Sequence, residues 1–316
     1  MPLPIHAYLP FANAARALLE KHFPGREAVC WSKPDEFATG IGDAVYLFAL
    51  QPPRVHWAKA EKLRLIQAFG AGVDYLLPAE GLSERVVIAN QRGMSADSMA
   101  EFGLTLVLAL LKQLPFFVSA QQSQRWERRL PERAAGKTLG ILGLGAIGLA
   151  LAARAHAHAL GMRVIGTQRE PKPHPAVAWT EAQSGTPRVL AESDVVVILV
   201  PLTDATRGSL GARELALLKP SAYLVNLARG GIVDEAALHA ALAGGRLAGA
   251  AFDVFAREPL PADSPLWKAP NFWLTPHVAG GFPDLLDTSI GLFADNVARL
   301  ERGQPVLSAV DRVRGY

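Results

Sequence analysis

The sequence has one cysteine, no long apolar run and little net charge. Because Cys30 stands alone among 316 residues, no intramolecular disulfide can form, and a reducing compartment is expected. The longest apolar run, residues 102–111, is about ten residues long, whereas a membrane-spanning helix needs about twenty. No basic segment followed by an apolar core opens the chain, so no signal peptide is expected. These absences favour a cytoplasmic protein without a membrane partner.

The charges and the potential metal ligands show no clustering. The formal net charge is +3, and basic residues are interleaved with acidic ones rather than gathered on one arm. No spacing of Cys and His typical of a metal site occurs. We therefore expect no nucleic-acid partner and no metal, and the slight positive charge fits an anionic small molecule.

Short apolar segments alternate with longer Ala- and Leu-rich amphipathic segments along the chain. Several of the short segments are apolar on both faces, as parallel strands buried beneath helices must be. The expected strands are residues 5–9, 44–48, 63–69, 85–89, 138–145, 162–167, 194–200, 222–228, 247–255 and 271–275. This alternation predicts an α/β protein with doubly wound parallel sheets, of Rossmann or flavodoxin-like type.

The expected domain boundary lies near residue 98, where one long helix over residues 98–118 is predicted to begin. A further helix is predicted over residues 283–300, and the tail after it is too short to form a domain, so it should return to the first domain. The sequence thus predicts a substrate domain of residues 1–98 plus 283–316 and a dinucleotide-binding domain of residues 99–282. A ligand would bind in the cleft between them.

A glycine-rich turn follows the expected strand at residues 138–145. The motif Gly143-x-Gly145-x-x-Gly148 opens a helix, and a second strand ends about 20 residues later, which is typical of dinucleotide binding. Gly143 permits the tight turn, and Gly145 lets the backbone approach a pyrophosphate. Gly148 lets helix and strand pack closely, while the helix N-terminus faces the phosphates. The alternative is a chance match in a helix start rich in Gly and Ala.

The second strand ends without the acidic residue that usually binds the adenosine ribose. Gln168 occupies this position, and Arg169 follows it. A carboxylate here accepts hydrogen bonds from the ribose hydroxyls and repels the 2′-phosphate of NADP. Its absence admits the phosphate, and an arginine can bind a phosphate through two hydrogen bonds, so the pair favours NADP, with NAD still possible. The alternative is that Arg169 and Lys172 are solvated loop charges.

Three later segments place polar residues at the carboxyl ends of expected strands, where open α/β sheets carry their chemistry. These residues are Arg229, Glu258 and His277. Each also has an ordinary explanation: Arg229 could pair with Asp234, Glu258 could be a turn residue, and most histidines are surface or core residues. Together they indicate polar chemistry on a small anion.

With these residues in place, the sequence resembles the D-2-hydroxyacid dehydrogenase family over nearly its whole length. The matching stretches are FGAGVD (69–74), GLGAIG (143–148), PLTDATRG (201–208), LKPSAYLVNLARGGIVDEAAL (218–238), DVFAREPLP (253–261) and TPHVAG (275–280). Within the family it is most similar to the glyoxylate/hydroxypyruvate reductase A group, through residues 93–102, 121–132 and 311–316.

The resemblance implies a reductase that converts a small 2-oxo acid, glyoxylate or hydroxypyruvate, to the D-2-hydroxy acid. NADPH would supply the hydride and His277 the proton. Glu258 would hold the imidazole and favour its protonated form, because a nearby anion stabilises a cation. Arg229 would bind the substrate and polarise its carbonyl group. The substrate carboxylate would bind backbone N–H groups of Ala71, Gly72 and Val73.

The resemblance also implies which residues contact the cofactor. The amides of Ala146 and Ile147 would bind the pyrophosphate, and Asp253 would accept a hydrogen bond from the nicotinamide carboxamide, although a strand-end turn could equally use such an acid. The full set is Gly143, Gly145, Ala146, Ile147, Gly148, Gln168, Arg169, Pro201, Thr206, Leu227, Ala228, Asp253, His277 and Gly280.

A homodimer is implied as well, with Trp126 reaching the substrate pocket across the interface. Plain packing is the alternative for such a large aromatic residue. We interpret Tyr75, Met94 and Phe282 as pocket residues that suit small substrates.

Two other functions stay open. One is an NAD-dependent dehydrogenase of the same fold that acts on phosphoglycerate or a bulkier 2-hydroxy acid, against which the missing acid at Gln168 counts. The other is a nucleotide-sensing corepressor, which the complete set of Arg229, Glu258 and His277 argues against. The sequence ranks neither the 2-oxo acids nor the direction of the reaction.

Overall fold

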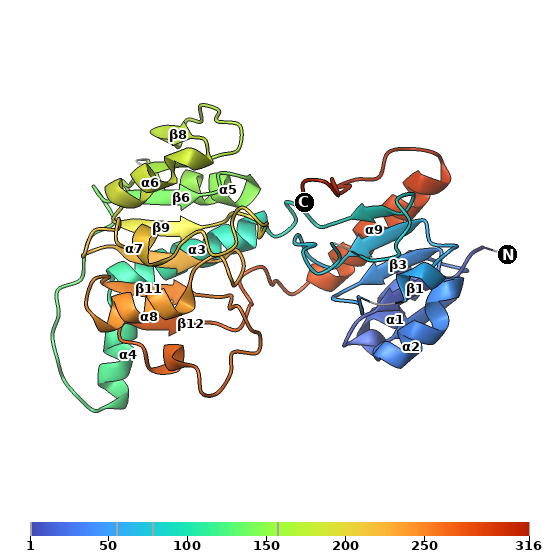
Figure 1. The fold of residues 1–316 in the computed structure, drawn as a ribbon, viewed down its shortest axis with the longest axis horizontal. Helices are drawn as coiled ribbons and strands as arrows, with labels where there is room; N and C mark the ends of the chain where they lie inside the picture. Colours follow the sequence, from blue (N-terminus) through green and yellow to red (C-terminus); the bar gives the residue numbers. More distant parts are fainter. Residues whose placement is uncertain (1, 55, 78, 157, 316) are drawn as a thin grey trace. The chain divides into compact units, whose positions relative to one another are not determined.

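The computed structural model describes residues 2–54, 56–77, 79–156 and 158–315, and the chain divides into two compact units. Unit 1 comprises Met1–Met94 and Phe282–Tyr316, and unit 2 comprises Ser95–Gly281. The divisions lie close to those expected after residues 98 and 282. Each unit is built on one parallel sheet (Figure 1).

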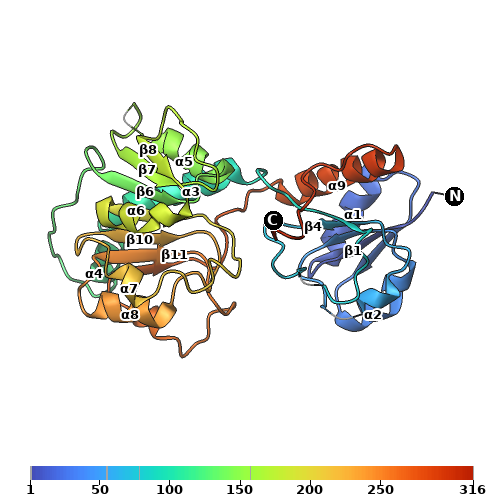
Figure 2. The same cartoon turned by 45° about the horizontal axis from the view of Figure 1, so that its top comes forward.

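Unit 1 has five parallel strands in the order β2-β1-β3-β4-β5. They are β1 (Ile5–Tyr8), β2 (Ala28–Trp31), β3 (Tyr46–Ala49), β4 (Leu65–Ala68) and β5 (Val87–Ala89). The helices are α1 (Ala12–His22), α2 (Pro34–Gly40) and α9 (Leu285–Glu301). Tyr46 and Phe48 pack with α1 and α9, whereas Leu47 packs with Phe37 of α2. Figure 2 shows these helices around the sheet of unit 1. The two-residue period of a strand thus buries both faces.

Unit 2 has seven parallel strands in the order β12-β11-β10-β9-β6-β7-β8. They are β6 (Thr138–Leu142), β7 (Arg163–Thr167), β8 (Trp179–Glu181), β9 (Val195–Ile198), β10 (Tyr223–Asn226), β11 (Gly249–Phe252) and β12 (Phe272–Leu274). The chain leaves β6 toward β7 on one side and returns to β9 on the other. The strand order therefore reverses between β6 and β9, which is where open α/β sheets bind ligands.

Helices cover both faces of this sheet. They are α3 (Ala96–Leu111), α4 (Leu114–Gln122), α5 (Ala146–Ala155), α6 (Thr186–Glu192), α7 (Ala212–Leu215) and α8 (Glu235–Ala243). Val195 and Val197 of β9 pack with α3 and α5, while Val196 and Ile198 pack with α6, α7 and α8. These helices are labelled in Figure 1. Short 3₁₀ helices cover Ile41–Asp43, Trp57–Lys59, Gln183–Gly185 and Pro265–Lys268. The expected fold of two doubly wound parallel sheets is confirmed.

The expectation of one continuous helix over residues 98–118 is wrong. The chain bends by 66° between α3 and α4. Gln113 adopts a left-handed conformation with φ 55°, and Pro115 stands in the first turn of α4, where its missing N–H costs no helical hydrogen bond. Among the residues described here, no single helix has the length and apolar character to cross a membrane, and the bent pair α3–α4 meets that test only when its two helices are joined.

Candidate functional site

The glycine turn lies at the reversal of strand order, between the ends of β6 and β9. Gly143 has φ +106°, and a Cβ there would stand 2.8 Å from the carbonyl carbon of Leu199. A Cβ on Gly148 would clash with the carbonyl oxygen of Gly143. Both positions therefore require glycine for the fold itself, because the helix and the two strands approach each other at backbone distance.

Gly145 differs from its two neighbours in the motif. Its φ of −87° suits any residue, and a Cβ there would meet nothing within 4 Å. It is the N-cap of α5, and no side chain caps this helix end. The first N–H groups of α5 and the open space beside Gly145 fit the pyrophosphate of a dinucleotide, which leaves no room for a side chain. Ala146 and Ile147 are the first two residues of this helix.

Gln168 follows β7 and is tied to the glycine turn. Its side-chain amide donates to the carbonyl of Leu144 at 2.9 Å, and its side-chain oxygen accepts the N–H of Lys172 at 3.2 Å. Gln168 thus shapes the loop that follows β7. Arg169 extends from that loop with 54% of its side chain exposed, and its Nε lies 3.9 Å from Glu170. The cation expected from sequence stands beside the turn, on a loop that Gln168 holds.

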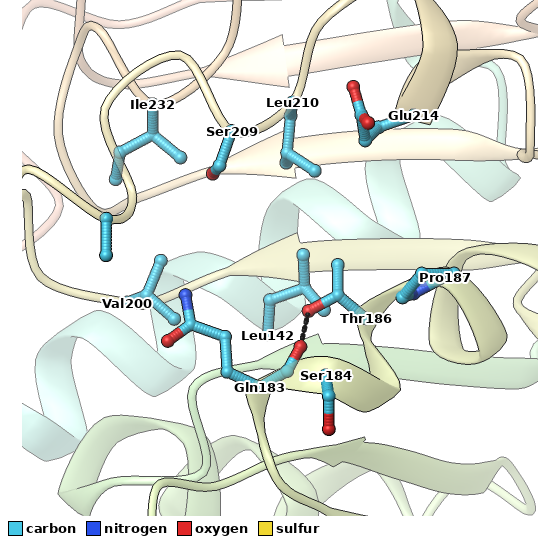
Figure 3. A pocket seen from close by; sticks show the side chains of 11 residues that line it. Leu142, Gln183, Ser184, Thr186, Pro187, Val200, Ser209, Leu210, Glu214 and Ile232 are labelled. Atoms are coloured by element: carbon cyan, nitrogen blue, oxygen red, sulfur yellow. Dashed lines mark hydrogen bonds between the residues drawn. The ribbon is translucent and has the colours of Figure 1, made fainter.

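A pocket of about 340 Å³ adjoins the turn (Figure 3). Leu142 at the end of β6 and Val200 after β9 form its apolar part, and the segment that begins α6 faces Leu210 and Ile232 across it. Thr186 closes that segment by donating to the carbonyl of Gln183 at 2.7 Å. The volume of the pocket and its largely apolar lining are those of a small-molecule site. The pocket thus lies next to the glycine turn, at the reversal of strand order.

Two more of the expected cofactor residues form the turn after β9. The Thr206 hydroxyl donates to the carbonyl of Pro201 at 2.6 Å and accepts the N–H of Thr203 at 2.8 Å. Thr206 is only 4% exposed. It therefore closes the turn from within, whereas Pro201 and Thr203 form the turn's backbone.

Arg229 lies in the loop after β10. The loop is held by Asn226, whose side-chain oxygen accepts the N–H of Ala228 at 3.1 Å and whose amide donates to the carbonyl of Arg229 at 3.1 Å. Leu227 and Ala228 are buried, and Arg229 donates to the carbonyl of Ala228 at 2.9 Å. A Cβ on Gly230 would clash with the backbone of Phe255. Glycine at this position lets the Arg229 loop lie directly against the loop after β11.

Glu258 and His277 come together from the loops after β11 and β12. His277 Nδ1 and Glu258 Oε2 are 2.7 Å apart, and the other carboxylate oxygen accepts the N–H of Phe255 at 2.9 Å. Glu235, the first residue of α8, accepts the N–H of Ala256 at 2.6 Å and holds the same loop. The side chain of His277 is 43% exposed, so its ring remains accessible.

The ionisation of Glu258 follows from these partners. Burial raises the pKa of Glu258, but the hydrogen bonds from His277 and Phe255 and the charges of His277 and Arg229 lower it more, so the net pKa lies below its ordinary 4.5. Glu258 is therefore a carboxylate at neutral pH. The charge of Arg229 lowers the pKa of Glu258, so Arg229 lies within electrostatic reach of this carboxylate at the carboxyl edge of the sheet.

Asp253, at the carboxyl end of β11, organises the segment that carries His277. Its carboxylate accepts hydrogen bonds from the Thr275 hydroxyl at 2.6 Å and from the N–H groups of Val278 and Ala279, each at 2.9 Å. Asp253 is 2% exposed, so these donors offset the cost of burying its charge. Gly280 is also expected to contact the cofactor, and a Cβ placed on it would lie 3.6 Å from the side chain of Ser95.

The loop expected to bind a substrate carboxylate belongs to unit 1 and follows β4. Gly70 has φ +126°, and its carbonyl accepts the N–H of Gln91 at 3.0 Å. The Asn90 side chain donates to the carbonyl of Ala71 at 2.7 Å. Val73 is buried, whereas Ala71 is exposed and Gly72 is partly exposed. The loop after β5 thus fixes the shape of the 71–73 segment.

The sequence reasoning missed the residues that hold the loops: Asn226, Gly230, Glu235 and Thr275. A glycine directly after an arginine and a threonine two residues before a histidine were visible in the sequence. Asn226 closes its own loop, whereas Gly230, Glu235 and Thr275 contact groups of other loops far away along the chain. No periodic pattern in the sequence reports either kind of contact.

Comparisons with known proteins find similar sequences and structures. The D-isomer specific 2-hydroxyacid dehydrogenase, NAD binding domain, matches residues 104–279. Glyoxylate/hydroxypyruvate reductase A of Klebsiella pneumoniae (strain 342) is 35% identical over 306 residues, covering 94% of each chain. A D-isomer specific 2-hydroxyacid dehydrogenase from Xanthobacter autotrophicus Py2, solved with NADPH and MES, has TM-score 0.86 and 34% identity over 100% of both chains. The NADPH-dependent glyoxylate/hydroxypyruvate reductase of Sinorhizobium meliloti, solved with NADP and sulfate, has TM-score 0.89 and 30% identity over 100% of both chains.

Proposed function

Because the chain belongs to the D-isomer specific 2-hydroxyacid dehydrogenase family, we propose that it is an NADPH-preferring reductase of small 2-oxo acids, glyoxylate and hydroxypyruvate, to D-2-hydroxy acids. The observation that carries the proposal is the hydrogen-bonded pair of His277 and Glu258 within the electrostatic reach of Arg229. The similarity to relatives named glyoxylate/hydroxypyruvate reductase supports the substrate class.

His277 is the proton donor in this proposal. Glu258 accepts the hydrogen bond from Nδ1 and is ionised at neutral pH, so it stabilises an imidazolium whose Nε2 gives its proton to the carbonyl oxygen as that oxygen becomes a hydroxyl. Positioned acids of this kind contribute about 10²–10⁴ in rate. A bound nicotinamide dinucleotide supplies the hydride that goes to the carbonyl carbon.

Arg229 binds the 2-oxo acid and stabilises negative charge on the carbonyl oxygen. Its guanidinium is always charged and offers several N–H donors in one plane, which suits a carboxylate and a neighbouring carbonyl. The backbone N–H groups of residues 71–73 bind the substrate carboxylate, and Tyr75, Met94 and Phe282 restrict the substrate's size. A guanidinium and a set of backbone N–H donors each favour an anion over a neutral ketone.

The cofactor preference rests on Gln168 and Arg169. Gln168 carries no negative charge to repel a 2′-phosphate, and its hydrogen bonds hold the loop from which the exposed Arg169 extends. The open space at Gly145 and the N-terminus of α5 receive the pyrophosphate, and the apolar pocket between Leu142 and Ile232 suits the adenine end.

The test is a comparison of kcat/KM for NADPH and NADH, first with glyoxylate and then with hydroxypyruvate. A clear NADPH preference that reverses in Arg169→Asp supports the proposal, because a carboxylate repels the phosphate. Equal use of the two cofactors, or an NADH preference, would refute the cofactor assignment. Absence of turnover on every 2-oxo acid would instead favour a nucleotide-sensing corepressor.

We also propose that the protein is a homodimer in the cytoplasm, joined through residues 114–131, here called the arm. Trp126 is 98% exposed and Leu130 is 87% exposed, so the arm presents large apolar side chains to water. The arm is nevertheless held in place: Arg129 lies 3.4 Å over the ring of Phe116, and Gln113 donates to the carbonyl of Leu130 at 3.0 Å. Sedimentation as a monomer at micromolar concentration would refute this proposal.

A further inference from the structure

The segment that carries His277 is fastened to Asp253 along its length. The main-chain N–H of His277 donates to the carbonyl of Asp253 at 2.8 Å. The N–H groups of the next two residues, Val278 and Ala279, donate to separate oxygens of the Asp253 carboxylate. The Thr275 hydroxyl donates to the same oxygen as Val278, at 2.6 Å. Residues on both sides of the histidine therefore share one buried anchor.

His277 needs such an anchor because of its backbone conformation. Its φ is 56°, in the left-handed region that side chains other than glycine rarely adopt. A non-glycine residue stays there only where its surroundings fix the backbone. The hydrogen bonds of Asp253 supply that constraint at the histidine and at the two residues after it.

The imidazole is thus held by two independent arrangements. Glu258 holds the ring through Nδ1, at 2.7 Å. Asp253 holds the backbone from which the ring extends, and Ser98 supports the far end of the segment by donating to the carbonyl of Gly281 at 2.8 Å. The ring partner sets the rotation of the imidazole, whereas the backbone anchor sets its position.

We propose that Thr275 and Asp253 are positioning residues for His277, with the Thr275 hydroxyl fixing the orientation of the carboxylate that holds residues 278 and 279. The proposal rests on the proposed function of His277 as proton donor. This positioning role is separate from any contact between Asp253 and a nicotinamide, because both carboxylate oxygens already accept hydrogen bonds from the segment that carries His277. Thr275 is the informative residue, since its side chain can be changed while the carboxylate is kept.

The test compares Thr275→Val, which keeps the shape and removes the hydroxyl, with Thr275→Ser, which keeps the hydroxyl. We expect kcat to fall about tenfold or more in Thr275→Val, because small displacements of a catalytic group are costly, while the Kd for NADPH and the KM for the oxo acid change little. Thr275→Ser should recover most of kcat. Thermal unfolding of both variants checks that they are folded.

A second readout does not depend on turnover. Hydrogen exchange of the Val278 and Ala279 amides, measured on the cofactor-free protein, should accelerate in Thr275→Val and stay near wild type in Thr275→Ser. Unchanged kcat and exchange in Thr275→Val would overturn the proposal. A loss confined to NADPH affinity would also overturn it, since Asp253 would then serve the nicotinamide alone. If the wild type itself has no turnover, the proposed function fails, whereas the exchange result still decides whether the anchor exists.

Discussion

Two parts of the same sheet edge in unit 2 are built in different ways. The loops after β10, β11 and β12 carry Arg229, Glu258 and His277. They are held to one another by hydrogen bonds of side chains and by a close backbone contact at Gly230. The loop after β7 carries Arg169, which is 54% exposed and supported by Gln168. The first part holds the polar side chains of the candidate site in fixed positions, whereas the second presents the charge of Arg169 to a ligand.

The difference reflects what each part has to do in the proposed reaction. Proton transfer depends on distances of a few tenths of an ångström, so His277 requires a rigid support. Recognition of a phosphate depends mainly on charge, and a long flexible cation on an exposed loop is sufficient for it. Substitutions in the first part should therefore change kcat, whereas substitutions in the second should change the choice of cofactor.

The largest expected effect is that of His277→Ala. Turnover should fall by about 10²–10⁴ because the positioned acid is lost, while the Kd for NADPH, measured by fluorescence titration, should stay close to wild type. Arg169→Ala is the matched variant from the other part, and it should keep kcat with saturating NADPH while raising the Kd for that cofactor. Undiminished turnover in His277→Ala would show that this residue is not the proton donor. The two parts of the sheet edge would then not differ in their effect on kcat.

The glycine turn contains the same difference within one motif, because Gly148 serves the fold and Gly145 is expected to serve cofactor binding. In Gly148→Ala the new methyl group would meet the Gly143 carbonyl, so we expect a loss of stability of about 1–3 kcal/mol in thermal or denaturant unfolding. In Gly145→Ala the methyl group has room, and the poorer N-cap should cost less than about 1 kcal/mol. Dinucleotide affinity should nevertheless fall at least about tenfold, or 1.4 kcal/mol, in Gly145→Ala. Equal affinity in Gly145→Ala and wild type would mean that no pyrophosphate lies against this residue.

How far the sequence predicted the fold depends on where each strand lies in its sheet. The central strands are apolar on both faces and were recognised as buried runs. β2 and β8 were missed, and both lie at a sheet edge, where residues such as Cys30 and Thr180 are partly exposed and the pattern weakens. The other two edge strands, β5 and β12, were nevertheless recognised. The bend between α3 and α4 was missed because apolar residues resume directly after Lys112 and Gln113, and only the Pro115 that follows marks the break.

For the candidate site, the sequence indicated the polar groups better than their supports. Glu258 and His277 each follow a strand, and parallel neighbouring strands end at the same edge, so their proximity could be expected. Gly230 and Thr275 act on backbone and carboxylate groups of other loops, which become neighbours only in the folded chain. Asp253 was expected at a nicotinamide, and the structure shows its carboxylate engaged with the histidine segment. Supporting residues of this kind can be identified only in the three-dimensional structure.

The smallest expected effect concerns the stability that the Glu258–His277 pair contributes at different pH values. Because the pKa of Glu258 is lower in the folded protein than its ordinary 4.5, its contribution is present above about pH 4.5 and is lost as the pH falls through the lowered folded value. The difference in Tm between wild type and Glu258→Gln should therefore be largest near neutral pH and should shrink toward pH 3. Arg169→Ala, an exposed substitution, should stay within about 0.5 kcal/mol of wild type. A Tm difference for Glu258→Gln that does not change with pH would mean that the carboxylate gains nothing from its partners, and the fastened part of the edge would then be held by packing rather than by charge.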